Sequence, residues 1–317
     1  MSPVLTVRNL CVRIGAGENA PSLVRGVDLD IVPGETLTLI GESGSGKTLT
    51  SLALLHLLPQ GMQLHTDELL LRERDIGRLG ETQFRELRGR RLAMIFQDPV
   101  GAFNPARRIG WHLHSVLVRA EGIGDWRRHA VTALADVGIT DPNGVLRRFP
   151  HQLSGGMLQR VLIAMVLALK PDVIIADEPT TNLDNIVERQ ILTLFRELQQ
   201  RLSSALLFIT HDMTIASLIS DRMAVMYAGQ IVEIGPAQTV LNQPRHPYTQ
   251  GLIATARALE SGSDTLTEIP GQPPAITDQD GGCAFRPRCK MARAGCGRPQ
   301  ILRQTEPPHA VRCLLYD

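Results

Sequence analysis

The segment Gly41-Glu-Ser-Gly-Ser-Gly-Lys47-Thr48 contains the residues whose spacing most clearly indicates chemistry. It fits the pattern G-x-x-x-x-G-K-[ST], in which glycines let consecutive backbone N–H groups converge on phosphate oxygens. We expect Lys47 to reach the β- and γ-phosphates of a nucleotide and the Thr48 hydroxyl to bind Mg²⁺. The alternative is a glycine-rich turn that happens to contain a lysine, which the flanking strand and helix patterns disfavour. The residues expected to hold the nucleotide here are Gly41, Ser43, Gly44, Ser45, Gly46, Lys47 and Thr48.

Two adjacent acids follow a buried-strand pattern in Val173-Ile-Ile-Ala-Asp177-Glu178. Asp177 at the strand end would place a carboxylate beside Mg²⁺, and Glu178 would polarise the attacking water. A pair of acids at a strand end is often only a solvated turn. The phosphate-binding pattern upstream favours the catalytic interpretation.

A second glycine-containing segment, Leu153-Ser-Gly-Gly-Met157, precedes a helical pattern at 158–169. Ser154, Gly155 and Gly156 form another candidate phosphate-binding helix start. Taken alone, the segment is an ordinary serine N-cap before a core helix. Its position between the other two motifs favours a role in nucleotide binding.

Together these motifs make the chain resemble the ATP-binding subunit of ABC transporters. The resemblance extends to Gln97 in Phe-Gln-Asp, Asp184 in Thr-Asn-Leu-Asp and His211 in Thr-His-Asp. It implies that Gln97 contacts Mg²⁺ and water, with Thr48 and Asp177 as the other Mg²⁺ ligands. It also implies that Asp184 crosses a dimer interface and that His211 holds the γ-phosphate and water. Such subunits work as head-to-tail pairs that sandwich ATP between one subunit's loop and the other's Ser154 segment.

Further segments resemble the oligopeptide/dipeptide/nickel import branch of that family. They are Phe149-Pro-His-Gln-Leu-Ser-Gly-Gly-Met, His246-Pro-Tyr-Thr249 and Ile269-Pro-Gly-x-Pro-Pro followed by four cysteines. Gly155-Gly-Met-Leu-Gln-Arg160 is similar to nickel and metallophore importers within the branch. The implied partners are a second related ATPase, two transmembrane permease subunits and an extracytoplasmic solute-binding protein. The implied function is ATP-driven import of peptides or a related small solute.

Two other functions fit parts of the pattern. A soluble ABC-type ATPase acting on nucleic acid or the ribosome usually has two cassettes or a long coiled-coil insertion, and this chain shows neither pattern. An iron–sulfur sensor that uses ATP binding only as a switch would not need the hydrolytic residues Glu178 and His211.

The chain departs from the family pattern at two places. The family usually has an aromatic residue near the end of the first strand, where it stacks on adenine, whereas this chain has Cys11-Val-Arg-Ile14. Losing a base–aromatic stack costs about 1–3 kcal/mol in single-strand binders, so we expect weaker affinity or base selectivity. Asn182 replaces a common alanine, and we expect little effect because Asp184 is retained.

Four of the five cysteines lie close to the end of the chain, as Cys283, Cys289, Cys296 and Cys313. The spacing C-x5-C-x6-C-x16-C lacks the C-x2-C pairs of zinc ribbons, and four thiolates suit an iron–sulfur cluster or Zn²⁺. Members of the resembled branch with this tail look like carriers of a [4Fe-4S] cluster. We rank the cluster first, zinc second, and free or disulfide-linked thiols third.

The elements that must position these residues alternate between strand and helix patterns. Strands are predicted at 4–14, 27–32, 36–40, 173–176, 205–209, 224–227 and 231–234, and helices at 48–58, 111–121, 126–137, 158–169 and 186–202. This alternation favours an α/β fold with a mainly parallel sheet. The resemblance implies a P-loop NTPase of the ABC ATPase type with an antiparallel β subdomain. We expect a cassette at 1–235, with an inserted helical subdomain at about 99–160, and a metal-stapled accessory region at 236–317, called the tail below.

Composition limits the setting. The net charge of +1 gives no reason to expect a nucleic-acid partner. The longest apolar run, Val161–Leu169, is too short to span a bilayer, and the first residues lack a signal-peptide pattern. The resemblance therefore implies a peripheral protein on the cytoplasmic face of the inner membrane.

Overall fold

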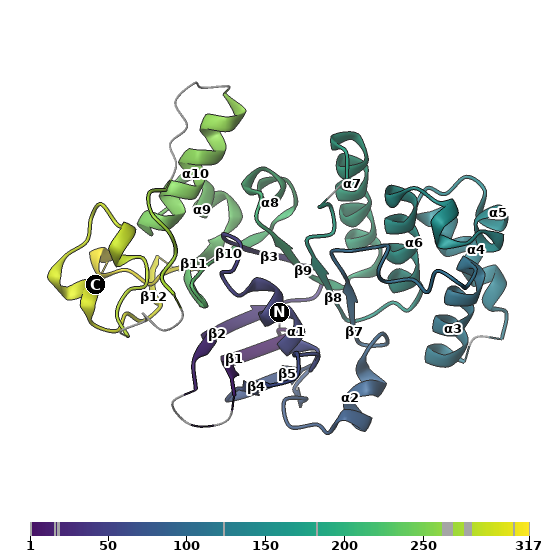
Figure 1. The fold of residues 1–317 in the computed structure, drawn as a ribbon, viewed down its shortest axis with the longest axis horizontal. Helices are drawn as coiled ribbons and strands as arrows, with labels where there is room; N and C mark the ends of the chain where they lie inside the picture. The colour runs from purple at the N-terminus through teal and green to yellow at the C-terminus, as the bar shows by residue number, and fades with distance from the viewer. Residues whose placement is uncertain are drawn as a thin grey trace. The chain divides into compact units, whose positions relative to one another are not determined.

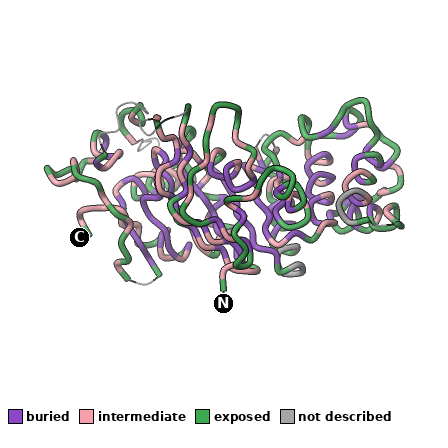
Figure 2. Tube along the Cα trace, turned by 90° about the horizontal axis from the view of Figure 1, so that it is seen from below, coloured by how far each residue is buried: buried purple, intermediate pink, exposed green. Residues whose placement is uncertain are grey.

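The computed structural model describes residues 2–15, 17, 20–122, 124–181, 183–261, 269–275, 281–306 and 308–316 (Figure 1). The chain divides into two compact units. The first unit comprises residues 1–4, 32–35 and 79–207, and the second comprises 5–31, 36–78 and 208–317. Buried residues follow the strands and the inner faces of the helices in each unit (Figure 2).

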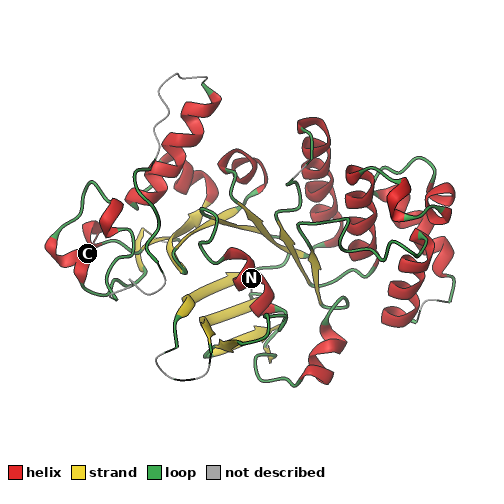
Figure 3. Ribbon diagram, viewed as in Figure 1, coloured by secondary structure: helices red, strands yellow, loops and turns green. Residues whose placement is uncertain are grey.

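An antiparallel sheet in the second unit confirms the expected antiparallel β subdomain. Its strands are β1 (Leu5–Ile14), β2 (Ser22–Ile31), β4 (Met62–His65), β5 (Glu68–Leu71) and β6 (Arg74–Asp75). They run in the order β2-β1-β5-β6, and β4 also pairs with β1 (Figure 3). In β1 the buried positions alternate, but the alternation slips by one residue at Asn9, whose φ is +52°. This slip keeps Leu10 and Val12 on the buried face, because a bulge residue resets the two-residue period.

A mixed sheet in the second unit contains the strand that precedes the glycine loop. The neighbours run in the order β12 (Arg303–Glu306), β13 (His309–Val311), β11 (Gln230–Pro236), β10 (Arg222–Tyr227) and β3 (Thr36–Ile40). Only the β10–β3 pair is parallel, so this part of the sheet is mixed and not mainly parallel. The difference arises because the tail itself adds two antiparallel strands, which sequence patterns did not predict.

Short helices and one longer helix complete the second unit. They are α1 (Lys47–Leu54), α8 (Met213–Ile219), α9 (Ala237–Asn242) and α10 (Pro247–Glu260). Helix α1 begins as predicted but ends at Leu54, before the predicted end at residue 58. His56, just after the helix, has a φ of +52°, which is not helical. One apolar cluster joins Ile40 at the end of β3 and Tyr227 of β10 to two residues of the tail, Tyr248 of α10 and Phe285. The tail is therefore packed into the core of this unit by its own side chains.

The first unit combines parallel strands with most of the longer helices. Strand β7 (Leu92–Ile95) pairs in parallel with β8 (Val173–Asp177), and β9 (Ala205–Thr210) is the next neighbour, its residues 208–210 belonging to the second unit. The helices are α2 (Glu81–Leu87), α3 (Ile109–Glu121), α4 (Trp126–Asp136), α5 (Pro142–Arg147), α6 (Gly155–Ala168) and α7 (Asn185–Leu202). Helix α4 packs against α3, α5 and α6. The helices predicted near 111–121 and 126–137 are thus present as α3 and α4, whereas the proposed boundaries of the helical subdomain and of the division at residue 235 stay predictions.

None of the helices in the described ranges has a stretch both long and apolar enough for a membrane crossing.

Candidate functional site

The phosphate loop, residues 41–48, is positioned by a fully buried strand and a short helix. All five residues of β3 are buried, and α1 begins at Lys47. Gly44 and Gly46 have φ values of +79° and +106°, which favour glycine. Gly41 is required for a different reason: a Cβ there would lie 2.1 Å from the carbonyl oxygen of Met226. The predicted strand–loop–helix context of the motif is therefore present.

Polar groups inside the phosphate loop are suited to an anionic ligand. The buried Lys47 places Nζ 2.8 Å from the Gly41 carbonyl oxygen and 3.0 Å from that of Glu42. Ser45 is 4% exposed, and its Oγ has no hydrogen-bond partner among the described residues. Ser43, Gly44 and Thr48 are exposed. An ammonium held by carbonyls within a loop of turned backbone fits the binding of nucleotide phosphates.

In the first unit, the structure brings Gln97 and Glu178 together. Gln97 Nε2 donates a hydrogen bond to Glu178 Oε2 at 3.1 Å. The contact follows from strand register. Ile95 of β7 lies opposite Ala176 of β8, and Gln97 and Glu178 each come two residues after these paired positions. Asp177, the last residue of β8, is 3% exposed.

Glu178 has an unusual backbone conformation. Its φ of +45° lies in the left-handed region, which costs energy for a residue with a Cβ. The carboxylate also accepts a hydrogen bond from Thr181 Oγ1 at 3.0 Å, so Gln97 and Thr181 fix the same oxygen. A strained and doubly held carboxylate at a strand end is the arrangement expected of a residue that orients a reactant.

Ser154 caps α6 in the first unit. Its hydroxyl accepts a hydrogen bond from the Met157 N–H at 3.3 Å, and the side chain is exposed. A Cβ on Gly155 would meet nothing within 4 Å, whereas one on Gly156 would lie 2.8 Å from Val187 Cγ1 of α7. Gly156 therefore allows two helices to approach closely, while Gly155 leaves the helix start open.

Asp184 and His211 follow different elements and lie in different units. Asp184 is exposed and caps α7, because its Oδ1 accepts from the Ile186 and Val187 N–H groups at 3.1 and 3.0 Å. His211 is exposed in the second unit after β9, and the next residue, Asp212, caps α8. Asn182 lies outside the described residues. The capping role of Asp184 was not foreseen from the sequence.

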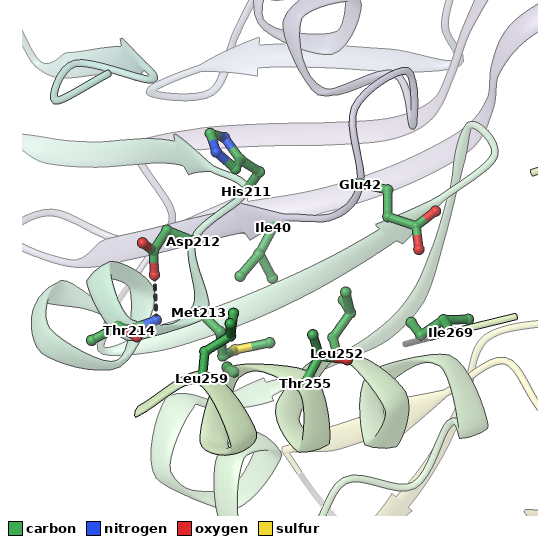
Figure 4. Close-up of a pocket in the computed structure, with 11 residues that line it drawn as sticks. Ile40, Glu42, His211, Asp212, Met213, Thr214, Leu252, Thr255, Leu259 and Ile269 are labelled. Atoms are coloured by element: carbon green, nitrogen blue, oxygen red, sulfur yellow. Dashed lines mark hydrogen bonds between the residues drawn. The ribbon is translucent and has the colours of Figure 1, made fainter. Parts of the chain in front are cut away.

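A pocket of about 670 Å³ lies in the second unit beside the phosphate loop. Glu42 and Ile269 lie at one end of it, and His211 and Asp212 lie at the other (Figure 4). Its floor is largely apolar and comes from Ile40 of β3 and from α10. The structure thus places Glu42 of the loop and the candidate residue His211 on one cavity.

Sequence reasoning missed two residues that hold the phosphate loop. Tyr248 Oη accepts a hydrogen bond from the Glu42 N–H at 2.8 Å, and Arg288 of the tail forms an ion pair with the Glu42 carboxylate at 2.9 Å. Burial raises the pKa of Tyr248 well above its usual range, so its hydroxyl stays neutral. Tyr248 belongs to the segment His246-Pro-Tyr-Thr249 that marked the resemblance, but nothing local to either sequence segment predicts the contact with Glu42.

The cysteines do not show the expected metal site. Within the described ranges, no group of three or more His, Cys, Asp or Glu side chains is arranged to hold a metal ion, and all five cysteines are free thiols. Burial raises the pKa of Cys313 to about 11 and raises that of Cys283 and Cys289, which favours protonated thiols. The expected metal-stapled tail is therefore not supported by the described structure. Phe285, Arg288 and strand β13 hold the tail instead.

Cys11 is half-buried in β1. Its Sγ accepts a hydrogen bond from the Gly26 N–H at 3.1 Å. It lies in the antiparallel sheet, apart in sequence and structure from the tail cysteines.

Comparisons with known proteins agree with these motifs. The family described as "ABC transporter" matches residues 24–181, and "Oligopeptide/dipeptide transporter, C-terminal region" matches residues 232–296. The dipeptide transport ATP-binding protein DppD of Bacillus subtilis (strain 168) is 41% identical over 100% of this chain and 96% of that protein. The oligopeptide transport ATP-binding protein OppD of the same organism is 42% identical, over 91% of this chain and 82% of that protein.

A solved structure supports the fold. The dimeric post-hydrolysis state of the ATP-binding cassette MJ0796, bound to ADP and Pi, matches with a TM-score of 0.64 at 23% identity, over 74% of this chain and 98% of that chain. Together with the family matches and the relatives above, this likeness shows that the chain belongs to the ABC transporter family. It is an ATPase of the group that carries the oligopeptide/dipeptide transporter C-terminal region.

Proposed function

We propose that this chain is the ATP-hydrolysing subunit of an importer of dipeptides or oligopeptides. The observation that carries the proposal is the 41% identity to a dipeptide transport ATP-binding protein across 100% of this chain. The names of the relatives compared above refer to dipeptides and oligopeptides, so peptides are preferred over nickel or a metallophore as cargo.

Within this function, the phosphate loop and the residues of the first unit have separate roles. Lys47 and the loop backbone would hold the phosphates of ATP, and Thr48, Gln97 and Asp177 would hold Mg²⁺, which neutralises charge on the phosphates. Glu178 would accept a proton from the attacking water, while Gln97 and Thr181 keep its carboxylate oriented. His211 would contact the γ-phosphate and water.

In a head-to-tail pair, the remaining site residues would act on the nucleotide held by the partner ATPase. Ser154, Gly155 and Gly156 would face ATP held by a second related ATPase, and Asp184 would lie at the interface between the two. The exposure of Ser154 and the open space beside Gly155 support this assignment. The pair would act on two transmembrane permease subunits at the cytoplasmic face of the inner membrane, with an extracytoplasmic solute-binding protein delivering the peptide.

A substitution at the helix start tests the pairing. Ser154→Arg should leave nucleotide binding by this subunit intact but lower ATP hydrolysis by the assembled complex. The matched control is His151→Arg, which places the same charge at another exposed position close to the segment. If the isolated chain hydrolyses ATP as fast as the complex, the paired mechanism is wrong.

Transport itself tests the function. The full chain, tagged and purified in mild detergent, should bring permease subunits with it, and the complex in proteoliposomes should accumulate a labelled dipeptide only with ATP and a functional Lys47. Co-purification with ribosomes or nucleic acid, and no transport, would favour the soluble ABC-type ATPase.

A metal centre in the tail is a separate part of the proposal. It rests on the spacing of Cys283, Cys289, Cys296 and Cys313. A [4Fe-4S] cluster is proposed first and Zn²⁺ second. Anaerobically purified protein should be brown with about four irons per chain, as a Cys₄ cluster requires. Colourless protein with stoichiometric zinc would select the second metal, and protein free of both would leave four structural thiols.

A further inference from the structure

All the guanidinium N–H groups of Arg288, in the tail, donate hydrogen bonds to acceptors around the phosphate loop. It makes five hydrogen bonds, to both carboxylate oxygens of Glu42, to Tyr227 Oη and to the carbonyl oxygens of Ile269 and Pro270. The Arg288 side chain is only 6% exposed, and that of Glu42 is 26% exposed. A guanidinium whose donors are all used is held rigidly, because each bond restricts the same planar group.

The acceptor of this contact belongs to the phosphate loop. Glu42 lies directly between Gly41 and Ser43, and its own N–H is bound by Tyr248 of α10 at 2.8 Å. Its side chain lies at the end of the pocket near Ile269 and away from His211 (Figure 4). The loop is therefore held at the same residue through its backbone by Tyr248 and through its side chain by Arg288.

The pairing has an electrostatic consequence. A nucleotide triphosphate is strongly anionic, and a carboxylate within the loop that binds it would repel it. An arginine that forms a bidentate ion pair offsets that charge and fixes the side chain away from other partners.

We propose that Arg288 is a positioning residue for the phosphate loop, which it prepares for ATP by pairing the Glu42 carboxylate. This rests on the proposed role of residues 41–48. It makes the tail, one residue before Cys289, a part of the nucleotide site of its own subunit. A change in the tail that displaces Arg288 should therefore alter ATP binding without touching a phosphate ligand.

The test is equilibrium binding of ATP to the full chain. Arg288→Ala should weaken binding about tenfold or more, since loss of one partner leaves a partly buried carboxylate unpaired. Arg288→Lys keeps the charge but loses the bidentate geometry, so its affinity should lie between those of wild type and Arg288→Ala. Removing the carboxylate as well, in Glu42→Ala/Arg288→Ala, should recover most of the loss.

A matched control separates positioning from folding of the tail. Arg312 is another largely buried arginine of the tail, and it donates to the carbonyl oxygens of Ile231 and Gln300 without any bond to the loop. Arg312→Ala should lower the melting temperature but leave the Kd for ATP unchanged. Hydrogen–deuterium exchange at residues 41–48 should rise in both Arg288 variants and stay at the wild-type rate in Arg312→Ala.

Each outcome is decisive. If Lys47→Ala binds ATP like wild type, the proposed loop site is wrong and the inference falls with it. If Lys47→Ala abolishes binding while Arg288→Ala and Arg288→Lys match wild type, only the inference is overturned. Equal affinity of Arg288→Ala and the double variant would also overturn it, because the Glu42 charge would then have no effect. If Arg288→Ala does not fold, Arg288→Lys and its exchange rates decide alone.

Discussion

The side-chain amide of Gln97 holds the carboxylate of Glu178, with 3.1 Å between Nε2 and Oε2. The two residues follow neighbouring parallel strands, and the register of β7 and β8 places them opposite each other. Because Thr181 donates to the same oxygen, the second oxygen of Glu178 is oriented by these two contacts together with the strained backbone. This geometry supports Glu178 as the base that activates water.

The first prediction is that Glu178→Gln lowers ATP hydrolysis by the assembled complex about 100-fold or more, the contribution typical of a general base. ATP binding should persist, since the substitution removes a proton acceptor and no phosphate contact, and ATP-bound pairs should accumulate. Steady-state hydrolysis and nucleotide retention after gel filtration measure both effects. Glu86→Gln on the exposed side of α2 is the control, and near wild-type turnover of Glu178→Gln would remove this residue from the catalytic role.

A second prediction concerns the missing stacking residue. Ile14 ends β1 and is 41% exposed, so a larger ring fits there without burial. Ile14→Tyr should strengthen ATP binding by about 1 kcal/mol, the lower value for base–aromatic stacking. Wild type should distinguish ATP from GTP poorly, and the variant better. Titration with both nucleotides checks this, with Ile301→Tyr at another exposed position as control, and equal ATP affinity of the two variants would show that adenine is held elsewhere.

Phe285 is predicted to be the main apolar anchor of the tail. The centroid of its ring lies 5.3 Å from that of Tyr227 and 5.4 Å from that of Tyr248, and the residue is 4% exposed. Phe285→Ala should lower the free energy of unfolding by about 3–5 kcal/mol, through lost burial and the cavity left behind. Chemical denaturation measures the loss. Met291→Ala, at a tail position that is 51% exposed, should have almost no effect, and similar losses for both would argue against a packed anchor.

Acid sensitivity is predicted at His246. Burial lowers its pKa to about 4, with attraction from Glu233 raising it and repulsion from Arg312 lowering it. In the unfolded chain, His246 has a pKa near 6.5 and binds the proton more readily. The free energy of unfolding is therefore highest above about pH 6.5, and it falls by about 3 kcal/mol as the pH drops to 4.

His246→Asn should reduce that pH dependence, because asparagine can still accept the Tyr248 N–H that His246 Nδ1 accepts at 3.1 Å. The measurement is the free energy of unfolding between pH 7 and pH 4 for wild type and variant. His65→Asn, at an exposed histidine, should follow the wild-type curve. A His246→Asn curve as steep as wild type would contradict the prediction.

Local patterns predicted the parts of the fold that depend on neighbours in sequence. The apolar run of β3 and the helical spacing of α7 are visible within short windows, and both elements are found where they were predicted. The tail strands were missed, because Arg303–Glu306 and His309–Val311 are short and lie in a proline-containing segment. They exist only because β11 pairs with β13.

The same distinction applies to the candidate site. Motif spacing predicted Lys47, Asp177 and Glu178 as site residues, since each motif carries its own strand and loop. Arg288 and Glu42 are separated by 246 positions, and no periodicity relates them. Cysteine spacing predicted a metal centre, yet packing by Phe285 and burial of the thiols determine the tail as described. Contacts between distant segments need the assembled core before they can be recognised.

The pairing of β13 with β11 has a consequence for the solubility of shortened chains. Glu233 and Ile234 of β11 are opposite Val311 and Ala310, and β12 covers β13 in turn. Truncation before residue 303 would turn β11 into an edge strand with unsatisfied N–H and C=O groups, and would deprive the fully buried Glu233 of His309. Exposed apolar edge strands recruit other chains by strand addition. The last residues of this chain therefore protect it from aggregation, independently of any cofactor or transport partner.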